Sequence, residues 1–123
     1  MKIDKYKVCV AKANGSGIVR KPFLVISKPF LLNPGEICSI SYLVLGAFDT
    51  KEEAMNLLHY VYTKFFRFIT FLLKTTRNTY KRVYGLVPAQ NYKEEWTDAK
   101  LYDKYGLTDK EIDLIESTIR EMN

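Results

Sequence analysis

The longest regular pattern of apolar and polar positions in the chain lies between Asp49 and Asn78. At its start Thr50 precedes Glu53 by three residues, which is the spacing of a capping box, and Glu52 and Glu53 suit the positive end of a helix dipole. The apolar residues that follow recur with the 3.6-residue period of a helix for about five turns, and no Gly or Pro interrupts them. The pattern therefore predicts one long helix with one buried face. Its apolar residues are Ala54, Leu57, Leu58, Val61, Phe65, Phe68, Ile69 and Leu72.

Shorter apolar stretches elsewhere in the chain have the character of β-strands. Residues 37–48 form the most regular of them and contain a continuous apolar run over residues 42–46. Because such a run is usually buried on both faces, we expect this strand to be central in a sheet. Further strands are predicted over residues 6–13, over 23–27, where Lys28 and Pro29 end it, and over 83–88.

The C-terminal part of the chain has the signals of two further helices. A short helix is predicted over residues 98–105, where Gly106 stops it. Thr108 and Glu111 then repeat the capping-box spacing and predict the start of the last helix. The apolar side of that helix is a narrow stripe of Ile112, Ile115 and Ile119.

Together these elements predict an α+β fold, in which a small mixed or antiparallel sheet packs on one long central helix. A chain of 123 residues suffices for one domain with a real core and is short for two. We therefore expect residues 1–123 to form a single domain. Within it, residues 1–90 would form a basic sheet-plus-helix core, and residues 91–123 a two-helix appendix.

The two cysteines, Cys9 and Cys38, lie in strand-like apolar runs and have no metal-ligand spacing. A pair of buried thiols in a reducing cytosol is the default interpretation, and a disulfide between them stays open. The first ten residues carry charges and no apolar core of a secretory signal, and no uncharged run reaches membrane-spanning length. We therefore expect a cytoplasmic protein without a membrane partner.

Charge is unevenly distributed along the chain, whose net charge is +5. Residues 1–90 hold 14 Lys and Arg against 5 Asp and Glu, whereas residues 91–123 hold 5 against 9. The basic part suits nucleic acid or an acidic membrane surface. The acidic part is explained by exposed helix surface.

Candidate catalytic or metal-binding groups are scarce. The single histidine, His59, lies off the apolar stripe of the long helix and has no Cys or carboxylate at ligand spacing, so we expect a partly exposed structural residue. The carboxylates Glu94, Glu95, Asp98 and Asp103 alternate with lysines near helix starts, where capping and the helix dipole account for most of them. The residues thus predict neither a metal site nor an enzyme active site.

Helix capping and the helix dipole do not explain a third group of residues, in which cations are interleaved with aromatic side chains. Tyr60, Thr63, Lys64, Arg67, Phe71 and Lys74 share one face of the predicted helix. The six cations Lys64, Arg67, Lys74, Arg77, Lys81 and Arg82 have no acid among them. Arg pairs with phosphates or with guanine, and Tyr stacks on bases or bonds to phosphates, so the pattern favours DNA binding. The alternative is an ordinary solvated helix face.

A second cationic segment precedes these residues. Residues 14–17 contain two glycines and Asn14, which predicts an exposed turn close to Lys12, Arg20 and Lys21. Lys12 and Asn14 are therefore candidate contacts to the DNA backbone. A plain hairpin loop is the alternative interpretation.

The order and spacing of many of these residues resemble the C-terminal segment of bacterial type II restriction–modification enzymes that carry an adenine-specific DNA methyltransferase. The likeness spans nearly the whole chain and rests on order, because no single motif in it is specific. The quoted segments are Lys12-Ala13, Gly15 and Gly17, Lys28-Pro29-Phe30, Tyr42-Leu43-Val44-Leu45-Gly46, Phe48-Asp49-Thr50-Lys51-Glu52-Glu53-Ala54, Thr63-Lys64-Phe65-Phe66-Arg67-Phe68, Val83-Tyr84 with Val87-Pro88, Trp96-Thr97-Asp98, Leu101-Tyr102, Lys104-Tyr105-Gly106-Leu107, Ile115-Glu116-Ser117 and Ile119-Arg120.

The resemblance implies a part of the enzyme that lies downstream of the catalytic domain and recognises the target DNA. The methyltransferase signatures of that family, an Asn-Pro-Pro-aromatic motif and a Gly-rich cofactor loop, are absent here, and Asn33-Pro34-Gly35 lacks the second proline and the aromatic residue. The chain is thus expected to be no enzyme by itself and to hold no cofactor. S-adenosylmethionine would bind the catalytic domain, which would be a partner together with double-stranded DNA.

Two other functions are compatible with the residues. The first is a protein–protein docking module within a restriction–modification complex. In this case the chain would dock on a partner through its own aromatic surface. A small standalone nuclease is the second, but it would need a cluster of metal-binding acids that the sequence does not have.

Overall fold

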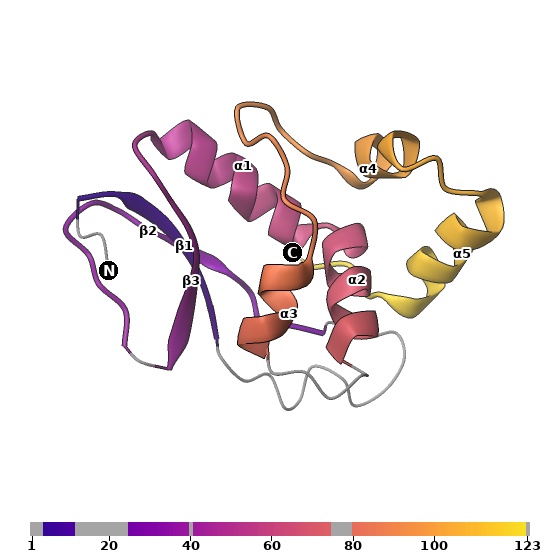
Figure 1. Ribbon diagram of the computed structural model, residues 1–123, viewed down its shortest axis with the longest axis horizontal. Coiled ribbons are helices and arrows are strands. Elements are labelled where there is room, and N and C mark those ends of the chain that lie inside the picture. The colour runs from indigo at the N-terminus through magenta and orange to yellow at the C-terminus, as the bar shows by residue number, and fades with distance from the viewer. Residues whose placement is uncertain (1–3, 12–24, 40, 75–79, 123) are drawn as a thin grey trace.

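The computed structural model describes residues 4–11, 25–39, 41–74 and 80–122, with the backbone alone for Tyr80 and Lys81. These residues form an α+β fold, as the sequence pattern predicts, with one three-stranded antiparallel sheet and five helices (Figure 1). The sheet lies at one end of the molecule, α4 and α5 lie at the other, and α1 to α3 lie between them. The elements are β1 Tyr6–Ala11, β2 Phe30–Leu32, β3 Tyr42–Phe48, α1 Lys51–Tyr62, α2 Lys64–Lys74, α3 Tyr80–Leu86, α4 Asp98–Lys104 and α5 Asp109–Thr118.

The strand order is β2-β1-β3, which corrects the expectation for β3. β1 is the central strand and four of its six residues are buried, whereas β3 lies at the edge and alternates between exposed and partly buried positions. The continuous apolar run of β3 therefore does not mark a strand buried on both faces. Val44, for example, is 40% exposed.

The second strand also lies later in the chain than the pattern predicts. A strand was expected over residues 23–27, of which residues 25–27 are described. These three residues are not in a strand, and Val25 has a φ of 74° that no strand residue adopts. β2 begins instead at Phe30, directly after Pro29. A proline has no N–H to donate, so it suits the position just before an edge strand.

The long helix predicted from Asp49 is two helices that meet at Thr63. Thr63 has an extended ψ of 152°, and its hydroxyl donates to the carbonyl of Tyr60 at 2.6 Å and accepts from the amide of Phe66 at 3.1 Å. The Thr63 side chain thus caps α2 as an N-cap residue does. Asp98 adds to the cap, because its carboxylate accepts from the amides of Lys64 at 3.1 Å and Phe65 at 2.8 Å.

The start of α1 has only part of the predicted capping box. The Thr50 hydroxyl accepts from the Glu53 amide at 3.3 Å, as expected. The Glu53 carboxylate, however, accepts from the Thr50 hydroxyl at 2.9 Å instead of returning to the Thr50 amide. The N-terminus of α1 is therefore capped through one backbone hydrogen bond.

Residues 83–88, which the pattern predicts as a strand, belong mostly to helix α3. Val83 is fully buried, and the ring of Tyr84 stacks on that of Phe66 in α2, with centroids 6.2 Å apart. The β-forming residues Val83 and Tyr84 adopt a helix here because they pack on another helix and have no strand partner. Packing of this kind overrides the intrinsic preference of a short segment.

The two C-terminal helices form as predicted. Thr108 and Glu111 make both bonds of a capping box at the start of α5, and Gly106 adopts the positive φ of 59° that ends α4. Leu101 and Ile115 are buried in the same hydrophobic cluster as α1 and α2. The C-terminal segment therefore helps to build the main core of the described residues.

Membrane insertion has no candidate helix in the described ranges, since none of their helices has the length and apolar character that crossing a bilayer requires.

Candidate nucleic-acid interface

Arg67 is the predicted DNA-contact residue whose position differs most from the expectation. It lies on α2 with 1% of its surface exposed. Its Nε donates to the carbonyls of Tyr62 at 3.2 Å and Thr63 at 3.3 Å, and its Nη1 donates to the carbonyl of Arg120. Burial lowers the pKa of Arg67 to about 10, while the charges of Asp98 and Glu121 act in the opposite direction.

These contacts make Arg67 a structural residue. Its guanidinium satisfies backbone carbonyls at the C-terminal end of α1, where the negative end of the helix dipole favours a cation. The same group holds the backbone that follows α5. The guanidinium is enclosed by the protein, so a contact between Arg67 and DNA would require these hydrogen bonds to open.

Lys64, one turn earlier on α2, is partly exposed and faces α5. Its Nζ lies 3.0 Å from Oε1 of Glu116, whose Oε2 accepts from the Tyr102 hydroxyl at 2.6 Å. The Tyr102 hydroxyl, followed by the Lys64 ammonium, holds the pKa of Glu116 below its ordinary value. A contact between Lys64 and a phosphate would thus require this ion pair to break.

The side of α2 that carries these residues is a seam with the C-terminal segment. Asp98 of α4 caps the start of α2, and burial raises the pKa of Asp98, against the lowering effect of the hydrogen bonds from Phe65 and Lys64. Glu116 and the Arg120 carbonyl complete the set of anionic or polar partners. Lys64 and Arg67, the first half of the predicted set of six cations, therefore bind other groups of the protein itself.

The second half of the cationic set lies at the other end of α2. Lys74 is the last residue of that helix and is partly buried, and Arg82 is exposed in the first turn of α3. Both make interactions with other groups of the chain. The two helices pack side by side, and the end of α2 and the start of α3 lie on the same side of the molecule (Figure 1).

Four predicted contact residues cannot be placed by their side chains. Lys12, Asn14 and Arg77 lie outside the described residues. The backbone of Lys81 belongs to the first turn of α3, but its side chain lies outside them too.

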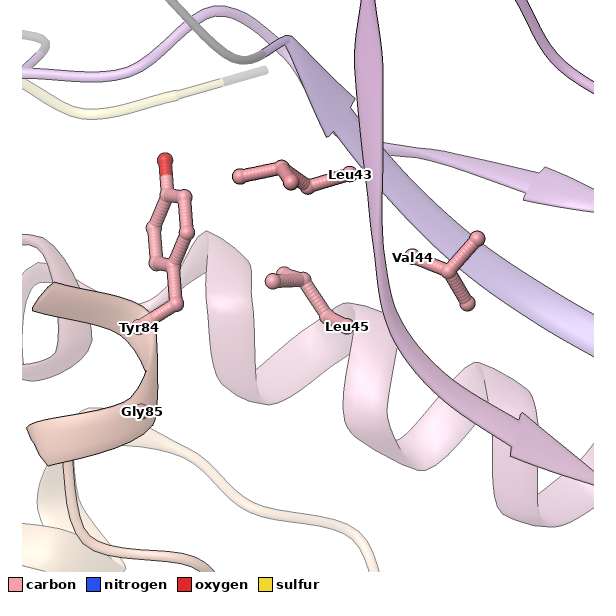
Figure 2. Close-up of a pocket in the computed structure, with 5 residues that line it drawn as sticks. All are labelled: Leu43, Val44, Leu45, Tyr84 and Gly85. Atoms are coloured by element: carbon pink, nitrogen blue, oxygen red, sulfur yellow. The ribbon is translucent and has the colours of Figure 1, made fainter. Parts of the chain in front are cut away.

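An apolar hollow of about 270 Å³ lies between β3 and α3, the helix that carries Arg82. Leu43 and Leu45 point from β3 toward Tyr84 of α3, while Val44 points to the opposite side of the strand (Figure 2). Gly85 completes its lining. The sequence gives no signal for this hollow, because it depends on residues 83–86 forming a helix.

A second apolar hollow, of about 220 Å³, lies between α2 and α5. Leu72 and Leu114 line it and are 45% and 52% exposed. It opens next to the seam, and Glu111 is the one charged residue in its lining. Its surface suits an apolar partner better than a phosphate.

His59 contacts one acidic residue in the described ranges. His59 is partly exposed, and its Nδ1 lies 3.5 Å from a carboxylate oxygen of Glu95, a contact that residue spacing did not reveal. No group of three or more His, Cys, Asp and Glu side chains within the described part of the chain is arranged to hold a metal ion.

Comparisons of the chain with protein-family models, with curated proteins and with solved structures find no match. The resemblance to restriction–modification enzymes stays a prediction that rests on the residue pattern.

Proposed function

We propose that the chain is a non-catalytic module that binds double-stranded DNA for a type II restriction–modification DNA methyltransferase. In this proposal the contacts come from the α2–α3 end of the molecule, and the N-terminal half of α2 serves stability alone. The module would work in the bacterial cytoplasm beside a catalytic domain that binds S-adenosylmethionine. The resemblance supports the enzyme class, and the placement of the cations supports the surface.

The observation that carries the proposal is the concentration of positive charge between Lys74 and Arg82. Four cations lie within this segment, and the nearest acids along the chain are Glu53 and Glu94. Lys81 and Arg82 stand in the first turn of α3, which holds no acid. Cations at that end oppose the helix dipole at a cost of about 0.3–1 kcal/mol each, so helix stability does not account for them. An anionic ligand would make favourable contacts with these cations.

Phosphate binding predicts a strong dependence on salt, because each neutralised phosphate releases counterions. The test is fluorescence anisotropy of a labelled duplex with the full chain over a range of salt concentrations. Arg77→Glu with Arg82→Glu should weaken binding and make the salt slope shallower by about 2. The control is Lys93→Glu with Lys110→Glu, which changes net charge equally at exposed positions outside this end. Equal losses in both variants, or binding that is insensitive to salt, would contradict the proposal.

A second candidate function is docking on the catalytic chain of the same kind of complex, and the hollow between α2 and α5 favours it. Leu72 and Leu114 expose apolar surface there. Their replacement by Ser should abolish assembly with the catalytic chain in a pull-down and leave DNA binding unchanged. If the Arg77 and Arg82 reversal abolishes assembly instead and DNA retention persists, docking through the cationic end replaces the first proposal.

A further inference from the structure

Cys9 and Cys38 lie in contact although 29 positions separate them in the chain. Cys9 is fully buried in the central strand β1, and Cys38 is partly buried in the segment between β2 and β3. Both are free thiols, and their sulfurs are 3.9 Å apart, with the Cys9 thiol donating to Cys38. The contact brings together the only two cysteines of the sequence.

Local structure holds the two thiols in this arrangement. After β2 the chain turns at residues 33–36, where the Glu36 amide donates to the Asn33 carbonyl at 3.0 Å and Gly35 has a φ of 89°. Lys7 lies on the same face of β1 as Cys9, and its buried ammonium donates to the Glu36 carbonyl at 2.9 Å. Cys38, two residues after Glu36, is thereby held over Cys9.

We propose that Cys9 and Cys38 form a reversible intramolecular disulfide by exchange with a low-molecular-weight disulfide such as oxidised glutathione. The sulfurs would have to approach by roughly 2 Å to reach the length of an S–S bond. This inference does not rest on the proposed DNA binding.

The exposure of the two thiols sets the order of the exchange. The Cys38 thiolate, which solvent reaches, attacks one sulfur of the glutathione disulfide, forms a mixed disulfide and releases one glutathione thiolate. Burial raises the pKa of the Cys9 thiol to about 12, with the Lys7 ammonium acting in the opposite direction, so Cys9 reacts second. Cys9 loses its proton to water, attacks the Cys38 sulfur and displaces the second glutathione thiolate. Two protein thiols and one disulfide thus become one protein disulfide and two glutathione thiols.

The bond would close a loop from residue 9 to residue 38 and tie the central strand to the segment that leads to β3. A cross-link over a loop of this length restricts the unfolded chain, so the oxidised protein should unfold at a temperature roughly 10 °C higher. Lys12 and Asn14 fall inside the closed loop.

The test is to incubate the full chain with oxidised glutathione and to follow its mass and its thiols. We expect the mass to fall by two hydrogen atoms, both thiols to become unreactive under denaturing conditions, and the chain to stay monomeric on a non-reducing gel. Dithiothreitol should reverse all three changes, and peptide mapping should find Cys9 joined to Cys38.

Single variants separate the two steps. Cys9→Ser should stop at a stable adduct of one glutathione on Cys38, because the second thiol is missing. Cys38→Ser should gain an adduct far more slowly, because Cys9 is buried. The proposal is overturned if the wild-type chain stops at the mixed disulfide, if it forms only intermolecular bonds, or if both thiols stay free. These readouts involve no DNA and apply to the wild-type chain even where a variant fails to fold.

Discussion

The two halves of the cationic segment have the same kind of sequence and different surroundings in the structure. The first half, Lys64 and Arg67, faces the C-terminal segment and binds Glu116 and the Arg120 carbonyl. The second half, represented by Lys74 and Arg82, lies at the end of α2 and the start of α3, where both residues also interact with other groups of the protein. Charge along a sequence therefore does not identify a ligand surface, because a distant segment of the same chain can provide the counter-charge.

The largest effect is expected from removing the buried guanidinium. Arg67→Ala leaves a cavity and removes the guanidinium hydrogen bonds to three backbone carbonyls, so the free energy of unfolding should fall by about 3–5 kcal/mol. Urea denaturation measures it. Arg67→Lys, which keeps the charge but not the planar set of donors, should recover only part of the loss. A loss below about 1 kcal/mol for Arg67→Ala would show that the guanidinium does not hold the seam.

Charge reversal in each half compares the two directly. Arg82→Glu should weaken duplex binding by roughly tenfold without lowering the unfolding free energy, since the side chain is exposed and the first turn of a helix favours an acid. Lys64→Glu should place a second carboxylate beside that of Glu116 and lower the free energy of unfolding, with little effect on DNA affinity. The comparison breaks if Lys64→Glu weakens DNA binding more than Arg82→Glu does.

A smaller effect is expected at the junction of α1 and α2. Thr63→Ala removes a buried hydroxyl that bonds to Tyr60 and Phe66, so the free energy of unfolding should fall by about 1 kcal/mol. Thr63→Ser keeps the cap and serves as the control. Equal stability of the two variants in urea would mean that Asp98 alone caps α2.

The smallest effect is expected from the Lys64–Glu116 pair. Glu116→Gln should lower the stability at pH 7 by only a few tenths of a kcal/mol, because the pair is partly exposed and screened by solvent. The folded state holds the pKa of Glu116 below its ordinary value, so this contribution is complete above about pH 4.5 and is lost as the pH falls further. Thermal unfolding of both proteins at pH 7 and pH 3 measures it. A difference that grows at pH 3 would contradict this assignment.

Signals confined to a few neighbouring residues predicted the parts of the fold that depend on local interactions. The Thr108–Glu111 box and Gly106 placed the start of α5 and the end of α4. Each of these signals is a hydrogen bond or a backbone conformation that the segment determines alone. The fold class followed from them.

The candidate site depended much more on contacts between distant residues. The residues next to Arg67 in the sequence do not indicate that its guanidinium is buried. Its partners are the carbonyls of Tyr62, Thr63 and Arg120, and Arg120 lies 53 positions away. Thr63 had the chemistry of an N-cap, but the apolar period continued across it and outweighed that signal. The nearness of Cys9 and Cys38 likewise depends on the turn after β2 and on Lys7.

The sequence by itself determined the α+β class, the capped C-terminal helices and the excess of positive charge before residue 91. Only the tertiary structure decided that β1 is the central strand, that residues 83–86 are helical and that Arg67 is internal. The physical reason is that burial and charge pairing are properties of surfaces that meet in the folded chain. A residue pattern records which side chains are present, while their partners come from elements that lie far away in the sequence.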